Sequence, residues 1–199
     1  SFKLYTDSGL VTPFSGLYQL VHQTDLSDNP QDFQLWFGSN TAGRQLETTT
    51  AGGTNNITLT PVEILPAWVT LTAYSLGDTV EPVADNGFRY TCTAAGTTAA
   101  SEPTWPTVGL GSTVVDGTVT WTLTSATHEP TEVKLAATAG GLAGATGGAA
   151  LSLGTTLLAG TGNAVEVNMR VTNTVITTGS NTGNPELSID IVSVTETVA

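Results

Sequence analysis

The stretch between Pro66 and Pro130 constrains the fold of this chain most, because tryptophans and tight-turn signals concentrate there. It contains three of the four tryptophans. Two dipeptides, Asn86-Gly87 and Asp116-Gly117, each precede a run in which apolar and polar residues alternate. This combination is typical of β-hairpins whose turns require a positive φ. Residues 66–129 are therefore predicted to form a small, aromatic-rich β module.

The alternation that follows Asn86-Gly87 predicts which residues the module buries. Phe88, Tyr90 and Cys92 are separated by Arg89 and Thr91, so a strand here has one packed face and one face in water. Cys92 is expected to be buried and inert. It is also the only cysteine, which excludes an intrachain disulfide.

The segments on either side of the module show strand periodicity, and no helical period persists over three turns. Strands are expected at 16–22, 32–38, 44–49, 56–62, 131–136, 164–171 and 187–194. A turn cluster occupies 180–185. The Gly/Ala-rich segment 137–148 is predicted to be a loop that lies close to a neighbouring backbone, since glycine at this density is unfavourable in helices and strands.

Each flank alone offers too few strands for an independent core, whereas the two together have the length of an ordinary domain. We therefore expect an all-β chain in which 1–65 and 130–199 together form a β-sandwich. The module 66–129 is expected to be inserted into one of its loops, where insertions are well tolerated. The competing arrangement is three separate domains in a row.

The composition narrows the classes of partner. The net charge is -12 and only five residues are Lys or Arg, so a nucleic-acid partner is excluded. No apolar run is long enough for a transmembrane helix and no signal peptide is visible, so we expect no membrane partner and folding in the cytoplasm. The low content of charged residues, 11%, suits either a protein packed in an assembly or an extracellular β domain.

The motifs of the module occur in an order that resembles known families of proteins. Trp68, Tyr74, Gly77-Asp78, Val80 and the Gly87–Tyr90 hairpin resemble the small chitin- and cellulose-binding modules of bacterial chitinases. The continuation through 102–106 and 115–121, with Trp105 between prolines, looks more like a variant common in structural proteins of tailed bacteriophages. The flanks are similar to phage virion proteins only in their acidic, Gly/Thr/Ala-rich β character.

The resemblance implies that some aromatic side chains form flat platforms for sugar rings. The candidate carbohydrate-binding residues are Trp105, Tyr74 and Trp68. The alternative is that Trp68 and Trp121 belong to the core, since so small a module needs large aromatics to supply buried area. Trp105 is either a lid on that core or an exposed contact, and Tyr74 fits either role.

No catalytic or metal-binding motif is present, so no enzyme activity, cofactor or metal is expected. The two histidines, His22 and His128, are far apart in the sequence, and Asp25, Asp28 and Asp32 miss the calcium-loop spacing and are expected to be a solvated turn. The acidic residues as a whole form no spacing that identifies a catalytic pair.

These observations lead to the hypothesis of a bacteriophage virion structural protein, assembled in the host cytoplasm. The favoured form is a homotrimeric capsid decoration protein that contacts the major capsid protein and displays the carbohydrate-binding-like module. The alternative is a tail or baseplate protein that contacts other tail proteins and binds host surface glycans. A third hypothesis, a depolymerase, requires a carboxylate pair in a cleft.

Overall fold

A computed structural model describes residues 1–14, 27–175 and 186–199. The strand expected at 16–22, the turn cluster at 180–185, and the side chains of His22 and Asp25 lie outside the described residues. The chain forms two compact units. We call the first, made of the described residues of 1–62, 129–175 and 187–199, the host; the second, Glu63–His128 with Glu186, is the module.

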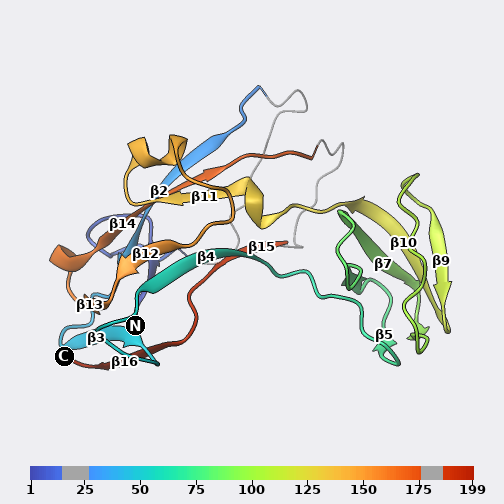
Figure 1. Cartoon of the computed structure of the whole chain (residues 1–199), viewed down its shortest axis with the longest axis horizontal. Helices are drawn as coiled ribbons and strands as arrows, with labels where there is room; N and C mark the ends of the chain where they lie inside the picture. The colour runs from blue at the N-terminus through green and yellow to red at the C-terminus, as the bar shows by residue number, and fades with distance from the viewer. Residues whose placement is uncertain (15–26, 176–185) are drawn as a thin grey trace. The chain divides into compact units, whose positions relative to one another are not determined.

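Three antiparallel sheets form the host (Figure 1). The four-stranded sheet has the spatial order β1 (Lys3–Tyr5), β2 (Gln31–Gly38), β14 (Val165–Val171) and β11 (Val133–Ala136). One three-stranded sheet has the order β12 (Leu151–Gly154), β4 (Ile57–Glu63) and β15 (Leu187–Asp190). The other has the order β13 (Thr156–Leu158), β3 (Arg44–Thr48) and β16 (Val194–Val198). Short 3-10 turns occur at η1 (Pro130–Glu132), η2 (Ala139–Ala143) and η3 (Thr161–Asn163).

Strands from the two ends of the chain pair with each other in every host sheet. The longest such ladder joins β2 to β14, from Gln31 opposite Val171 to Phe37 opposite Val165. In the same way β3 pairs with β13 and β16, and β4 with β12. The predicted fold class, an all-β sandwich built from N- and C-terminal segments with an inserted module, is therefore confirmed. The arrangement as three separate domains is excluded.

The host core lies between the four-stranded sheet and the two smaller sheets. Alternate residues of each strand point inward, as their period of two requires. From the large sheet these are Leu35 and Phe37 of β2, Val133 and Leu135 of β11, and Val167, Met169 and Val171 of β14. Leu46, Ile57, Leu59, Leu153 and Leu157 contribute from the facing sheets. The strands expected at 32–38 and at 164–171 are confirmed as β2 and β14.

Two strand predictions in the C-terminal half need correction. The expected strand 187–194 is broken, because Ser193 adopts a φ of 56° and the chain passes from β15 in one sheet to β16 in another. The expected strand 131–136 begins only at Val133, because Pro130–Glu132 form η1. An alternating pattern does not reveal a change of sheet, since both pieces keep the same period.

The Gly/Ala-rich segment lies against a neighbouring backbone, as predicted. A Cβ atom at Gly147 would overlap the carbonyl oxygen of Thr131, so only glycine fits this approach. The segment is not simply a loop, however. It contains η2, which buries Leu142. This 3-10 helix begins after Thr138, and the Thr138 hydroxyl accepts a hydrogen bond from the Gly141 N–H.

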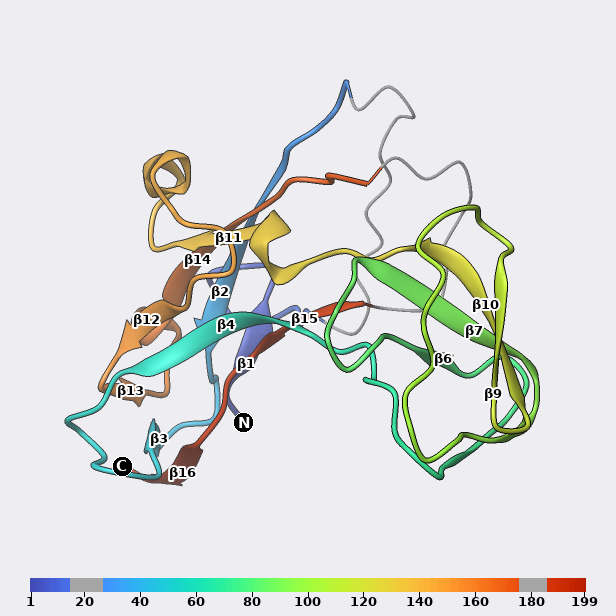
Figure 2. The ribbon, with the colours of Figure 1, turned by 45° about the vertical axis from the view of Figure 1, so that its right-hand side comes forward.

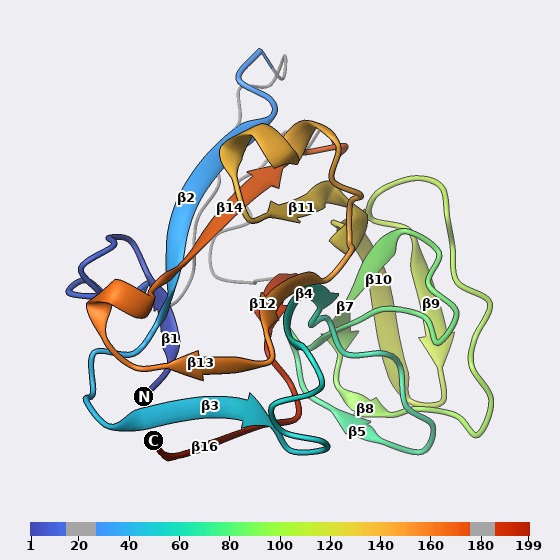
Figure 3. The same cartoon turned by 60° about the vertical axis from the view of Figure 1, so that its left-hand side comes forward.

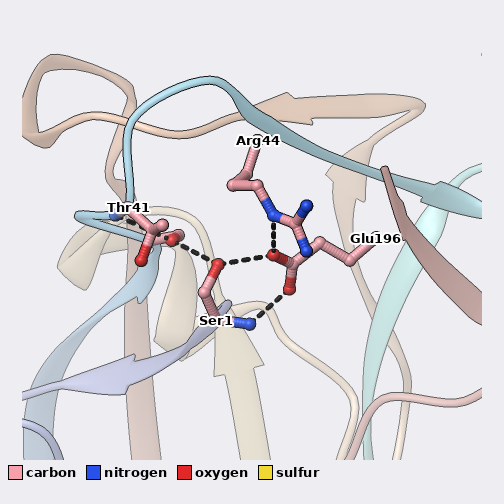
Figure 4. A network of polar contacts seen from close by, with 5 residues as sticks. Ser1, Thr41, Arg44 and Glu196 are labelled. Atoms are coloured by element: carbon pink, nitrogen blue, oxygen red, sulfur yellow. Dashed lines mark hydrogen bonds and ion pairs between the residues drawn. The ribbon is translucent and has the colours of Figure 1, made fainter. Parts of the chain in front are cut away.

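A polar network joins the two ends of the described chain at β3 and β16 (Figure 4). Glu196 accepts hydrogen bonds from the Ser1 amine, from the Ser1 hydroxyl at 2.7 Å and from Arg44 Nε at 2.7 Å. The Ser39 hydroxyl donates in turn to the Ser1 hydroxyl at 2.7 Å. These donors, the amine first, lower the pKa of Glu196 to about 2. The carboxylate consequently stays ionised in mild acid.

The module consists of two antiparallel sheets, of which the larger is visible in Figure 2. The larger has the order β6 (Thr79–Val80), β7 (Phe88–Ala94), β10 (Val119–Ala126) and β9 (Thr113–Asp116); the smaller pairs β5 (Ala73–Tyr74) with β8 (Gly96–Thr97). The hairpin predicted at Asp116-Gly117 joins β9 to β10, with φ of 61° at Gly117. No helix in the described residues is long and apolar enough to span a membrane.

Candidate functional site

The aromatic cluster of the module contains the side chains singled out from the sequence. Its buried part comprises Trp68, Val80, Tyr90, Cys92, Val119, Trp121 and Leu123. Tyr74, Phe88, Trp105 and Val114 pack against it and remain partly exposed. The burial expected for Cys92 is confirmed, and that burial raises the pKa of its thiol.

The centre of the cluster is Asp116, the last residue of β9, which is only 2% exposed. Its Oδ2 accepts hydrogen bonds from the indole N–H groups of Trp68 at 2.7 Å and Trp121 at 3.2 Å. Its Oδ1 accepts the backbone N–H of Ala99 at 2.8 Å. Three donors thus compensate a carboxylate that has lost its water. The sequence predicted a turn at Asp116 but not this role.

Trp68, one of the three candidate carbohydrate-binding residues, belongs to the interior. Its side chain is 7% exposed, and its indole N–H is taken by Asp116. It therefore offers no open ring face to a sugar, as the core alternative for this residue anticipated. Trp121, with no exposed surface, is also a core residue.

Trp105 is both a lid on the cluster and a partly exposed contact. Its ring packs on Tyr90 with centroids 4.3 Å apart and on Trp121 at 6.0 Å. Its indole N–H donates to Glu102 Oε1 at 2.8 Å. The hydroxyl of Tyr90 donates to the carbonyl oxygen of Pro106 at 2.8 Å, so both ends of this loop are fixed.

Tyr74 lies on β5 and meets the edge of Trp121, with ring centroids 4.9 Å apart and an interplanar angle of 74°. Its hydroxyl accepts the backbone N–H of Val69 at 3.2 Å. The preceding loop is held by the buried hydroxyl of Thr98, which donates to the Val69 carbonyl at 2.8 Å and accepts the Thr72 N–H at 2.9 Å. Tyr74 is therefore positioned before any ligand arrives.

Tyr74 and Trp105 thus flank one buried indole, and both side chains stay partly exposed. Exposed aromatic rings are in general the kind of surface on which a pyranose stacks, since their negative faces attract polarised C–H groups. Among the described residues, no group of three or more His, Cys, Asp or Glu side chains has the geometry to hold a metal ion.

One prediction for the module's polar face is wrong. Arg89, expected in water between Phe88 and Tyr90, is 5% exposed, and its Nη1 lies 2.7 Å from Oε1 of Glu186. A buried cation needs such a partner. The carboxylate comes from a part of the chain far from Arg89 in sequence, so the local alternation carried no signal of it.

Comparison with protein-family models, with curated proteins and with solved structures gives no match to this chain.

Glu81, which follows β6, makes the stability of the module dependent on pH. Its pKa is raised above the ordinary value, mainly because burial disfavours its charge, although a hydrogen bond with Glu63 opposes the shift and the charge of Asp85 adds to it. The folded module thus binds the proton more tightly than the unfolded chain. This contribution to stability is present below the ordinary pKa of about 4.5 and is lost as pH rises through the raised value.

Glu81→Gln, which cannot ionise, should remove this dependence. We expect the variant and the wild type to have the same Tm at about pH 4, and the variant to have the higher Tm at about pH 7. Thermal unfolding followed by tryptophan fluorescence at both pH values measures the difference. A variant Tm below the wild-type value near neutral pH would contradict the assignment.

Proposed function

We propose that this protein is a non-enzymatic structural component of a bacteriophage particle, a capsid decoration protein that displays the aromatic module. The observation that carries the proposal is the pairing of β2 with β14, together with β3 and β4 with their C-terminal partners. The host has a core built from both chain ends, so it can serve as a scaffold while the inserted module carries a separate binding role.

Two further features support a place in a symmetric assembly. The surface is poor in charged residues, which lowers the cost of burying it against neighbours. Among the described residues, the strand β16 is the edge of its sheet and leaves Val198 74% exposed, so a second copy or a capsid subunit has a strand edge to pair with. A homotrimer on the major capsid protein fits these features.

The test is to purify particles from the phage that encodes the chain and to locate the chain in an electron-microscopy map of the head. We expect density for the host at a repeated position on the capsid lattice and a trimer in solution by light scattering. Absence of the chain from purified particles, together with a stable monomer in solution, would overturn the proposal. Density on the tail would favour the alternative position instead.

The second candidate function, glycan binding by a tail or baseplate component, is favoured by the open ring surfaces of Tyr74 and Trp105. Trp105→Ala removes one stacking surface, worth about 0.5–1.5 kcal/mol, so adsorption to host glycans should weaken roughly 2- to 10-fold. Trp105→Phe keeps an aromatic face and should bind more tightly than the alanine variant. A glycan array and host-cell adsorption give the two measurements.

The near-ultraviolet circular dichroism of each variant provides the folding control, since Trp121 and Tyr90 must stay packed for the comparison to be valid. A wild-type protein that gives no signal on the glycan array removes this second function. The decoration role is tested separately by the location of the chain in the particle.

A further inference from the structure

The outer face of the host's four-stranded sheet carries a hollow that none of the proposed functions uses. It has a volume of about 200 Å³. Its lining comes from two adjacent strands and from η2, which follows β11 and lies beside β14 (Figure 3). The lining residues, which define what we call the Asn168 hollow, are Asp32, Phe33, Gln34, Ala139, Leu142 and Asn168.

The polar lining follows from the alternation of β2 and β14. Leu35 and Val167 point into the core, so Gln34 and Asn168, which face each other in the register of these strands, point to the outer face. This polar face is not fully open to water, because η2 covers part of it and Leu142, 2% exposed, supplies an apolar wall.

Asn168 is the feature that indicates a ligand. The residue is 3% exposed and lines the hollow. Its Nδ2 donates to Glu166 Oε1 at 2.9 Å, and Gln34 Nε2 donates to the same oxygen at 2.8 Å. No hydrogen bond to the Oδ1 of Asn168 is found among the described residues, and this oxygen is not one of the fully enclosed polar atoms that lack a partner. Because Asn168 lines the hollow, its Oδ1 is available to accept a hydrogen bond from a ligand there.

The charges around the hollow balance. Arg170 holds Asp32 through two hydrogen bonds of 2.7 Å, and Lys134 lies opposite Arg170 in the register of β11 and β14. Glu166 supplies the second negative charge. With two cations and two carboxylates close together, the site favours neither an anion nor a cation. It favours a neutral ligand that both donates and accepts hydrogen bonds.

We propose that the Asn168 hollow binds a single neutral sugar unit, with the carboxamides of Asn168 and Gln34 hydrogen-bonded to its hydroxyl groups and Leu142 against its C–H face. Carboxamides suit hydroxyl groups because each offers two donors and one acceptor. This site belongs to the host and does not depend on Tyr74 or Trp105. Its test is therefore independent of glycan binding by the module.

The test is a titration of the full chain, labelled with ¹⁵N, followed through the side-chain amide resonances of Gln34 and Asn168. The probes are glucose, galactose and N-acetylglucosamine, with glucuronate as a charged counterpart. We expect saturable shifts of both amides with at least one neutral sugar and weaker binding of glucuronate. Trp105→Ala should leave these shifts unchanged.

Gln34→Ala is the decisive variant, because Gln34 is exposed and its removal leaves the core intact. Loss of one or two hydrogen bonds should raise the Kd about 3- to 10-fold. Asn168→Ala should weaken binding further; if it fails to fold, Gln34→Ala still decides the outcome. Gln45→Ala, a carboxamide removed from β3, is the matched control and should keep the wild-type Kd.

Three results would each overturn the proposal. The first is the absence of a saturable shift with all three neutral sugars. The second is a set of shifts confined to the module. The third is an unchanged Kd in Gln34→Ala.

Discussion

Asp116→Ala should destabilise the module by at least about 3 kcal/mol, because it leaves three N–H donors without an acceptor in a buried site where each unpaired donor costs about 1–3 kcal/mol. Two of these donors are the indoles of Trp68 and Trp121, and the third is the amide of Ala99. All three point at a carboxylate that is 2% exposed, so water does not readily replace it.

The asparagine variant separates hydrogen bonding from size. In the native module Oδ2 serves both indoles and Oδ1 serves the Ala99 amide, so both oxygens act as acceptors. The carboxamide introduced by Asp116→Asn has one oxygen and one NH₂ group. Either the indoles or the Ala99 amide would then face another donor. Asp116→Asn should therefore lose stability despite its nearly identical shape, and by less than Asp116→Ala.

Urea unfolding followed by tryptophan fluorescence measures both variants, since Trp68, Trp105 and Trp121 report on the module and only Trp36 on the host. Asp85→Ala is the matched control: the Asp85 carboxylate is exposed and, among the described residues, accepts a single hydrogen bond, from the Gly87 N–H at 2.8 Å. It should cost no more than about 1 kcal/mol. If Asp116→Ala costs as little as Asp85→Ala, the aromatic cluster does not depend on this carboxylate.

At Asp116 the sequence predicted the turn but not the hydrogen-bond partners of the carboxylate. Asp-Gly before an alternating run predicted the hairpin correctly, because turn chemistry is local. Two partners of the carboxylate, Trp68 and Ala99, lie just outside the pair of strands β5 and β8, which brings their two segments together. Local sequence patterns do not encode such a pairing. The available signal was compositional: a small module with several tryptophans needs acceptors for their indole N–H groups.

In the host, too, local patterns predicted the strands but not how the chain passes between the sheets. Alternation predicted the strands that form β2 and β14, since Leu35 and Val167 belong to runs with the period of a strand. It did not predict that η2 covers Asn168, nor that Ser193 breaks the last strand. Both depend on the path of the chain between sheets. The aromatic residues of the module follow the same rule. The sequence offered the core as an alternative for Trp68 and two roles for Trp105, and only the contacts in the structure decide between these alternatives.

Removal of either partner of the Arg89–Glu186 ion pair should cost about 3–5 kcal/mol, because it takes a counter-ion away from a buried charge. The Nη1–Oε1 distance is 2.7 Å, and the two side chains are 6% and 4% exposed. Glu186 also accepts the backbone N–H of His128 at 2.9 Å. Its carboxylate therefore ties β7 to the segment that follows β10.

The exposed pair of Arg170 with Asp32 is the internal control. Its donor and acceptor distances are equally short, but the side chains are 28% and 48% exposed. Water and salt screen such a pair, so Arg170→Met should have little effect on the free energy of unfolding. Arg89→Met, the same change at the buried pair, should cost several times more. Burial, and not the distance between the atoms, sets the difference.

The double variant Arg89→Met with Glu186→Leu distinguishes a charge penalty from a loss of packing. If the single variants suffer because a lone charge stays buried, removing both charges should recover much of the loss, and the double variant should be more stable than Glu186→Leu alone. Urea unfolding of the four proteins gives the coupling energy directly. Additive losses would mean that Arg89 and Glu186 contribute separately, through their contacts with other groups, and that the ion pair is not what holds this part of the module together.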